Sequence, residues 1–117
     1  MNESILTSIK KLLGISEETI DFDQDIILHI NTVFMILFQL GVGPKTGFSI
    51  SDDSSTWADF LGKDTSLEAV KTYIYLRVRL LFDPPSNSFL QESFKRNADE
   101  LEWRLNVAVD PSRIEGD

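Results

Sequence analysis

The sequence predicts an all-α fold, a small bundle of about four helices within a single domain. Apolar residues recur at helical spacing in four spans, near residues 3–13, 24–40, 66–82 and 87–107. Glycine or proline separates these spans, and both residue types end helices. The chain has 117 residues, enough for one domain with a modest core. We expect residues 1–109 to form this domain and residues 110–117, which lack periodicity, to form a flexible C-terminal tail.

The first expected helix has one apolar stripe and ends at a glycine. The stripe consists of Ile5, Ile9, Leu12 and Leu13. Gly14 suits a left-handed C-cap. In the polar connector that follows, Asp21 or Asp23 offers a side-chain oxygen to cap the unpaired N–H groups of the next helix.

The second helix is apolar over most of its circumference. It runs from an acidic start at Asp25 to Leu40, and Gly41 and Pro44 close it. Because a surface helix needs only one apolar stripe, this helix must be covered on several sides, by its own domain or by neighbouring copies. Its expected core positions are Ile30, Val33, Phe34 and Leu37.

The stretch near residues 45–55 is the least regular, an irregular or hairpin-like loop. Apolar and polar residues alternate from Phe48 to Ser51, which favours a short strand or a hairpin arm. Residues 56–61 then form a single capped turn. Its inward side chains are Trp57, Phe60 and Leu61.

The third long helix carries apolar residues on two sides and is therefore expected at the centre of the bundle. Thr65 or Ser66 with Glu68 resembles a capping box at its start. One strip consists of Leu67, Val70, Ile74, Val78 and Leu81, of which the middle three are expected core residues. The other strip consists of Ala69, Tyr73, Leu76 and Leu80. Two strips require two packing partners.

The last helix has an inward and an outward apolar face. The inward face consists of Leu90, Phe94, Ala98, Leu101 and Leu105, with Leu101 and Leu105 in the core. Phe89, Trp103 and Val107 project on roughly the other side. This outward set indicates either a subunit interface or a core that the N-terminal helix closes.

Arg77 lies between the two apolar strips and is the best candidate for a buried or interfacial ion pair. Glu100 or Glu102 is its expected partner, within the domain or across a subunit boundary. The irregular loop can also reach a neighbour without disturbing the helical core. The candidate interface residues are Phe89, Trp103, Val107, Arg77, Phe48 and Ile50.

Composition excludes several classes of function. The formal net charge of −8 argues against general binding to nucleic acid or to an anionic membrane. The absence of cysteine removes disulfides, thiolate catalysis and cysteine-based metal sites. The N-terminus does not read as a signal peptide, and no apolar run is long enough to span a bilayer. We expect a soluble, intracellular protein.

The chain carries no complete catalytic or metal-binding pattern. His29 with Asp25 could form a pair for acid–base work, but the sequence favours a helix-surface or partly buried polar contact. The aspartates at positions 21, 23, 25, 52 and 53 do not complete a calcium loop, and the glycines do not match a phosphate-binding loop. We therefore predict no enzymatic activity, no cofactor and no metal.

The clearest pointer to function is a set of four segments in a fixed order. They are DIILHINTVFMILFQLGVGP at residues 25–44, TWADFL at 56–61, EAVKTYIYLRVRLLFDPP at 68–85 and ELEWRLNV at 100–107. Together they resemble the small phage and prophage proteins of the head–tail connector (adaptor, or head-completion) family. The resemblance covers about residues 3–107.

The resemblance implies an all-helical, non-enzymatic virion structural protein at the head–tail junction, assembled in the cytoplasm of a host bacterium. Its copies would form a dodecameric ring between the portal protein and the tail or stopper protein. DNA would pass through the channel without specific binding, and no membrane would be involved.

Two alternatives come from other classes of protein. The first is a small helical homodimeric regulatory or scaffold protein that binds a partner helix. The second is an enzyme with a cryptic site around His29. The mass of the purified protein separates a ring from a dimer.

Overall fold

The computed structural model describes residues 2–62 and 67–109, and all regular structure among these residues is helical. The helices are α1 (Ile5–Leu12), α2 (Asp23–Gln39), α3 (Trp57–Leu61), α4 (Leu67–Phe82) and α5 (Ser88–Val109). The four longer helices match the predicted spans, and α3 matches the predicted turn, so the all-α prediction is confirmed. The proposed capping residues Thr65 and Ser66 and the proposed tail at 110–117 lie outside the described residues.

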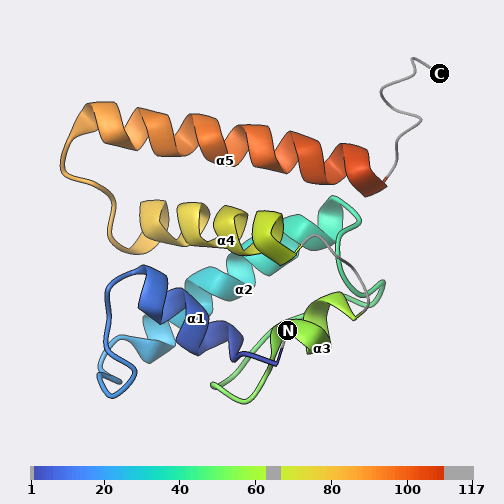
Figure 1. Cartoon of the computed structure of the whole chain (residues 1–117), viewed down its shortest axis with the longest axis horizontal. Helices are drawn as coiled ribbons and strands as arrows, with labels where there is room; N and C mark the ends of the chain where they lie inside the picture. The colour runs from blue at the N-terminus through green and yellow to red at the C-terminus, as the bar shows by residue number, and fades with distance from the viewer. Residues whose placement is uncertain (1, 63–66, 110–117) are drawn as a thin grey trace.

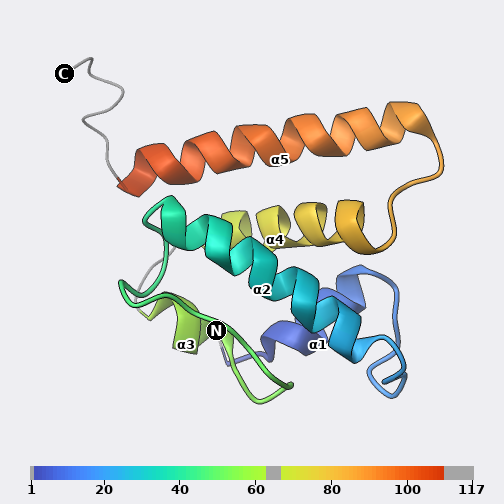
Figure 2. The same ribbon diagram turned by 180° about the vertical axis from the view of Figure 1, so that it is seen from behind.

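Helix α4 lies at the centre of the bundle, as its two apolar strips predict. It packs against α1, α2 and α5. Helix α5 runs antiparallel beside α4 along one edge, and α1 lies toward the opposite edge (Figure 1). Helix α2 crosses behind α4 in Figure 1 and in front of it in Figure 2. The molecule is flat, with extents of 48 × 35 × 19 Å, so much of its helix surface faces outward.

The buried core contains the predicted residues with one exception. Those of α2 (Ile30, Val33, Phe34, Leu37), those of α4 (Val70, Ile74, Val78) and Leu105 of α5 are buried. Leu101 is only partly buried, because α5 meets the rest of the bundle along one narrow side. The stripe residues Leu12, Leu81 and Leu90 are exposed, a correction to the sequence analysis. Each lies in a terminal turn of its helix.

Glycines end α1 and α2 as the sequence predicts. Gly14 and Gly41 have φ values of 81° and 85°, in the left-handed region that favours glycine. The N–H of Ile15 donates to the carbonyl of Lys10, and that of Val42 to Leu37, each at 2.9 Å. These bonds are those of the Schellman motif, which satisfies the last carbonyls of a helix.

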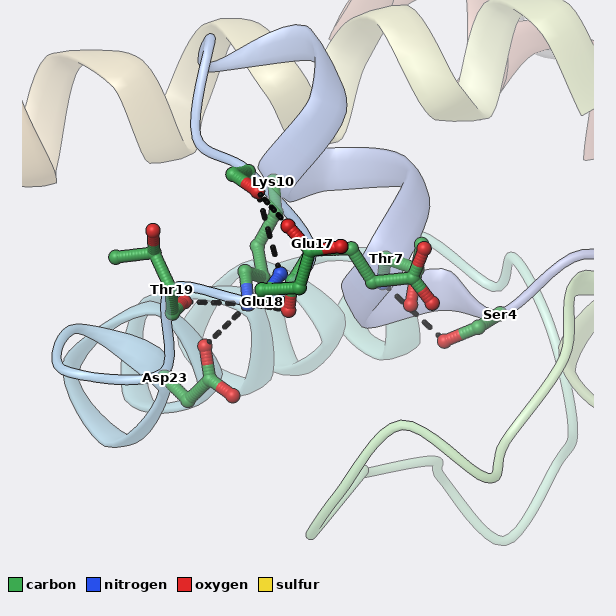
Figure 3. A network of polar contacts seen from close by, with 8 residues as sticks. Ser4, Thr7, Lys10, Glu17, Glu18, Thr19 and Asp23 are labelled. Carbon is green, nitrogen blue, oxygen red and sulfur yellow. Dashed lines mark hydrogen bonds and ion pairs between the residues drawn. The ribbon is translucent and has the colours of Figure 1, made fainter.

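The start of α2 differs from the prediction that Asp21 or Asp23 caps it. The N-cap position is Phe22, with no side-chain cap. The carboxylate of Asp23 instead lies 2.8 Å from the buried ammonium of Lys10, which also donates to the carbonyls of Glu17 (3.2 Å) and Thr19 (2.7 Å) (Figure 3). Asp23 Oδ1 is buried and has no hydrogen-bond partner among the described residues. Its ion pair with Lys10 therefore compensates the cost of its burial.

The loop between α2 and α3 contains no strand, so the predicted strand or hairpin arm at residues 48–51 is wrong. The backbone of Ile50 pairs with a side chain instead. Asn31 Nδ2 donates to the Ile50 carbonyl (2.9 Å), and the Ile50 N–H donates to Asn31 Oδ1 (2.8 Å). The alternating pattern reflects Phe48 and Ile50 turning toward the core from a single irregular segment.

Helix α3 is a short capped turn that joins the loop to the N-terminus. Thr56 and Asp59 form a capping box, and the predicted inward residues Trp57, Phe60 and Leu61 are buried. The indole N–H of Trp57 donates to Ser8 Oγ at 3.0 Å. An isolated antiparallel bridge between Ser4 and Thr56 ties this turn to the start of α1.

Candidate interaction surface

The outer face of α5 carries large apolar side chains that the protomer leaves uncovered. Phe89 is 74% and Trp103 58% exposed, and Val107 is partly buried. At about 100° per residue, these three positions share one side of the helix with Arg96 and Glu100. We call these five residues the outer α5 face. The alternative that the N-terminal helix closes over this set is wrong, because α1 packs on α2 and α4.

Arg77 is held inside the protomer by acidic residues of α5. Its Nη2 lies 2.8 Å from Asp99 Oδ1 and 3.1 Å from Glu102 Oε1. The predicted partner Glu102 is therefore confirmed, whereas Glu100 pairs with Arg104 on its own helix at 3.2 Å. The sequence analysis did not predict Asp99 as a partner of Arg77. The only sequence feature that points to it is its helical spacing from Glu102, three residues later on α5.

A buried tyrosine completes this α4–α5 cluster. Tyr73 is fully buried, and its hydroxyl donates to Glu102 Oε1 at 2.6 Å. Burial raises the pKa of Tyr73 to about 12, and the hydrogen bond to Glu102 acts in the same direction. Burial of Arg77 opposes its charge, but hydrogen bonds with Tyr73 and Asp99 outweigh this and raise its pKa. At neutral pH the cluster holds a neutral tyrosine and an arginine cation that joins the two helices.

The loop residues Phe48 and Ile50 contribute to the protomer core. Ile50 is 4% exposed. The ring of Phe48 lies edge-on to Phe34 and Phe60, with centroid distances of 5.2 and 5.3 Å. Most of the apolar surface of these two side chains, which the sequence suggested for contact with a neighbouring subunit, therefore packs within the protomer.

A groove that the sequence analysis missed lies between α2, α4 and α5. Its volume is about 520 Å³. It is lined by Thr32, Val33, Ile36, Arg77, Leu80, Leu81, Pro84, Gln91, Lys95 and Glu102. Leu28 and Met35, both exposed, lie beside Thr32 on the same face of α2. The nearly all-round apolar character of α2 is the sequence signal for this surface, but only the packing of three helices creates the groove.

The candidate catalytic and metal-binding residues do not assemble in the described part of the chain. His29 lies against Phe82, with ring centroids 6.3 Å apart, and no hydrogen bond to Asp25 is present among the described residues. Asp52 accepts hydrogen bonds from the hydroxyl and the N–H of Ser54, which lower its pKa. The described residues contain no group of three potential metal ligands and no helix of the length and hydropathy that crossing a membrane requires.

The fold and its uncovered apolar faces define a small all-helical protein suited to assembly with other chains. A protein-family model described as "Phage connector protein" matches residues 5–112. The chain therefore belongs to the phage connector protein family, whose members are structural components of the virion. No curated protein and no solved structure matches the chain.

Proposed function

We propose that this phage connector protein is a head–tail adaptor whose copies meet edge to edge in a dodecameric ring. The ring lies between the portal protein on the head side and the tail or stopper protein on the other. The observation that carries the proposal is the exposure of large apolar side chains on α1, α2, α4 and α5 of a protomer only 19 Å thick.

Such exposure is more than a lone small protein requires. Single exposed apolar residues are ordinary, but tryptophan and phenylalanine on one helix face are typical anchors of a protein–protein contact. Phe89 and Trp103 are both more than half exposed on α5, which lies at an edge of the flat bundle (Figure 1). Burying them against a neighbouring copy would remove a large apolar area from water.

The charge of the chain supports passage of DNA without specific binding. The formal net charge is −8, and like charge disfavours adhesion of a phosphate backbone to the channel wall. The ring therefore acts as an extension of the channel and as a platform for the tail, and it performs no chemistry on the DNA.

Deletion of the gene from its parent phage tests the proposal. Electron microscopy of the lysate is expected to show DNA-filled or leaking heads beside free, complete tails. Complementation with the wild-type gene should restore tailed particles, which separates loss of the protein from damage to neighbouring genes. Normal tailed particles in the deletion lysate would show that the protein is not a head–tail adaptor.

A further inference from the structure

We propose that Trp103 of one copy docks into the groove between α2, α4 and α5 of the next copy. This inference rests on the proposed ring, since it names the contact that joins neighbouring subunits. It commits to a second copy of this chain as the occupant of the groove.

The groove has the chemistry that receives an aromatic anchor. Val33, Ile36, Leu80 and Leu81 give it apolar walls, and its volume is about 520 Å³. A tryptophan buried in such a pocket can supply a large part of the binding free energy of an interface. Trp103 is 58% exposed in the protomer, and Trp57, the other tryptophan of the chain, is fully buried.

The two surfaces lie on different sides of one helix. Gln91, Lys95 and Glu102 of α5 line the groove, and at about 100° per residue they lie near Ala98, which is buried against the bundle. Trp103 lies about 100° further round the helix than Glu102, on the outer α5 face. A contact between unlike surfaces that each copy makes with a different neighbour is heterologous, and successive copies then form a ring when the rotation between them closes. A two-fold dimer would instead require the same two copies to exchange this contact in both directions.

Charges beside the two surfaces are complementary. Lys95 lines the groove and has no ion-pair partner among residues 2–62 and 67–109. Glu100 lies on the outer α5 face, one turn before Trp103. Its present partner Arg104 is exposed, and exposed ion pairs of this kind contribute little to stability. Glu100 is therefore available to Lys95 of the neighbouring copy.

Thiol cross-linking tests this contact, because the chain contains no cysteine of its own. Two alleles, Trp103→Cys and Leu81→Cys, are co-expressed while the parent phage assembles, so that the portal is present. A short bismaleimide is then added to the particles. A covalent dimer that joins position 103 of one chain to position 81 of another is expected. Leu12→Cys, at an exposed apolar position of α1, replaces Leu81→Cys as the matched control and should give no such product.

Two results would overturn the contact: particles that hold both variants without the 103–81 product, or a 103–103 product in higher yield. In either case the proposed function still stands if the deletion lysate contains free heads and tails. If a cysteine variant does not enter particles, a charge exchange replaces it. Lys95→Glu and Glu100→Lys should each lower the titre of infectious phage about tenfold, and the double variant should recover most of it. A double variant no better than the single ones would contradict the contact.

Discussion

Lys10 carries a buried ammonium group whose three oxygen partners come from the connector before α2 and from the first residue of α2. Glu17, Thr19 and Asp23 surround it, and the side chain is 3% exposed (Figure 3). Removing one member of a buried pair leaves the other charge without compensation. We expect Lys10→Met to lower the free energy of unfolding by about 3–5 kcal/mol, measured by denaturant unfolding.

The neighbouring lysine provides the control for this residue. Lys11 is exposed, so Lys11→Met should change the free energy of unfolding by no more than about 0.5 kcal/mol. Equal effects of the two substitutions would show that general charge, rather than the buried ion pair, accounts for the loss.

Tyr73 makes the stability of the folded protein decrease as the pH rises through the alkaline range. Its pKa is raised from 10.0 to about 12, so the folded state keeps the phenol proton where the unfolded chain has lost it. This contribution is complete below pH 10 and is lost as the pH rises from 10 through about 12. We expect the unfolding free energy of Tyr73→Phe to fall less steeply over this interval than that of the wild type.

Tyr75 is the matched control, since it is the only other tyrosine in the chain. Tyr75→Phe leaves Tyr73 as the sole phenol, and ultraviolet absorbance of tyrosinate then reports its titration directly. Titration of Tyr73 near pH 10 in the folded Tyr75→Phe protein would contradict the assigned shift.

At the scale of elements, one side-chain amide of α2 forms hydrogen bonds with the loop between α2 and α3. Asn31 both donates to and accepts from the backbone of Ile50. Asn31→Ala leaves these buried backbone groups without partners, at about 1–3 kcal/mol for each unsatisfied group. We expect faster hydrogen exchange at the Ile50 amide and a lower unfolding midpoint.

Asn31→Asp distinguishes the two bonds of this pair. An aspartate still accepts from the Ile50 N–H but cannot donate to its carbonyl. The exchange of the Ile50 amide should therefore be slower in Asn31→Asp than in Asn31→Ala. The same exchange rate in both variants would mean that the amide is protected by the surrounding fold.

The contact between α2 and α4 supplies the centre of the core. Phe34 and Ile74 are buried at 1% and 0% exposure. Replacing either with alanine should cost about 2–5 kcal/mol, because a cavity remains where the side chain was. Denaturant unfolding measures this loss, and unchanged midpoints for both variants would contradict the packing of these two helices.

For the whole molecule, the outer α5 face should matter to assembly and not to folding. Phe89→Ser and Trp103→Ser remove exposed side chains, and each should change the free energy of unfolding by about 0.5 kcal/mol or less. The double variant should nevertheless reduce head–tail joining in a complementation assay. Loss of joining together with a large loss of stability would show a folding defect instead.

The double variant Leu12→Ser with Ile20→Ser is the control in the same complementation assay. These side chains are also exposed and apolar, but they lie on α1 and in the connector after it, away from α5. We expect this control to support head–tail joining. Equal loss in both double variants would mean that total apolar exposure, and not the outer α5 face, governs assembly.

Much of the local structure followed from the sequence alone. Helical periodicity located the helices, and Gly14 and Gly41 ended two of them through backbone angles that other residues rarely adopt. The two strips of α4 predicted its central place, and the spacing of Phe89 and Trp103 predicted that they share a face. These features depend on residues close in the chain, where sequence spacing and spatial position are linked by the geometry of a helix.

Tertiary structure alone decided the features that join distant segments. Asp23 has the side chain of a helix cap but pairs with Lys10, and residues 48–51 have the pattern of a strand but Ile50 pairs with the side chain of Asn31. The groove between α2, α4 and α5 exists in no single segment. The physical reason is that a polar or apolar side chain has several local partners of similar free energy, and only the packing of the helices selects among them.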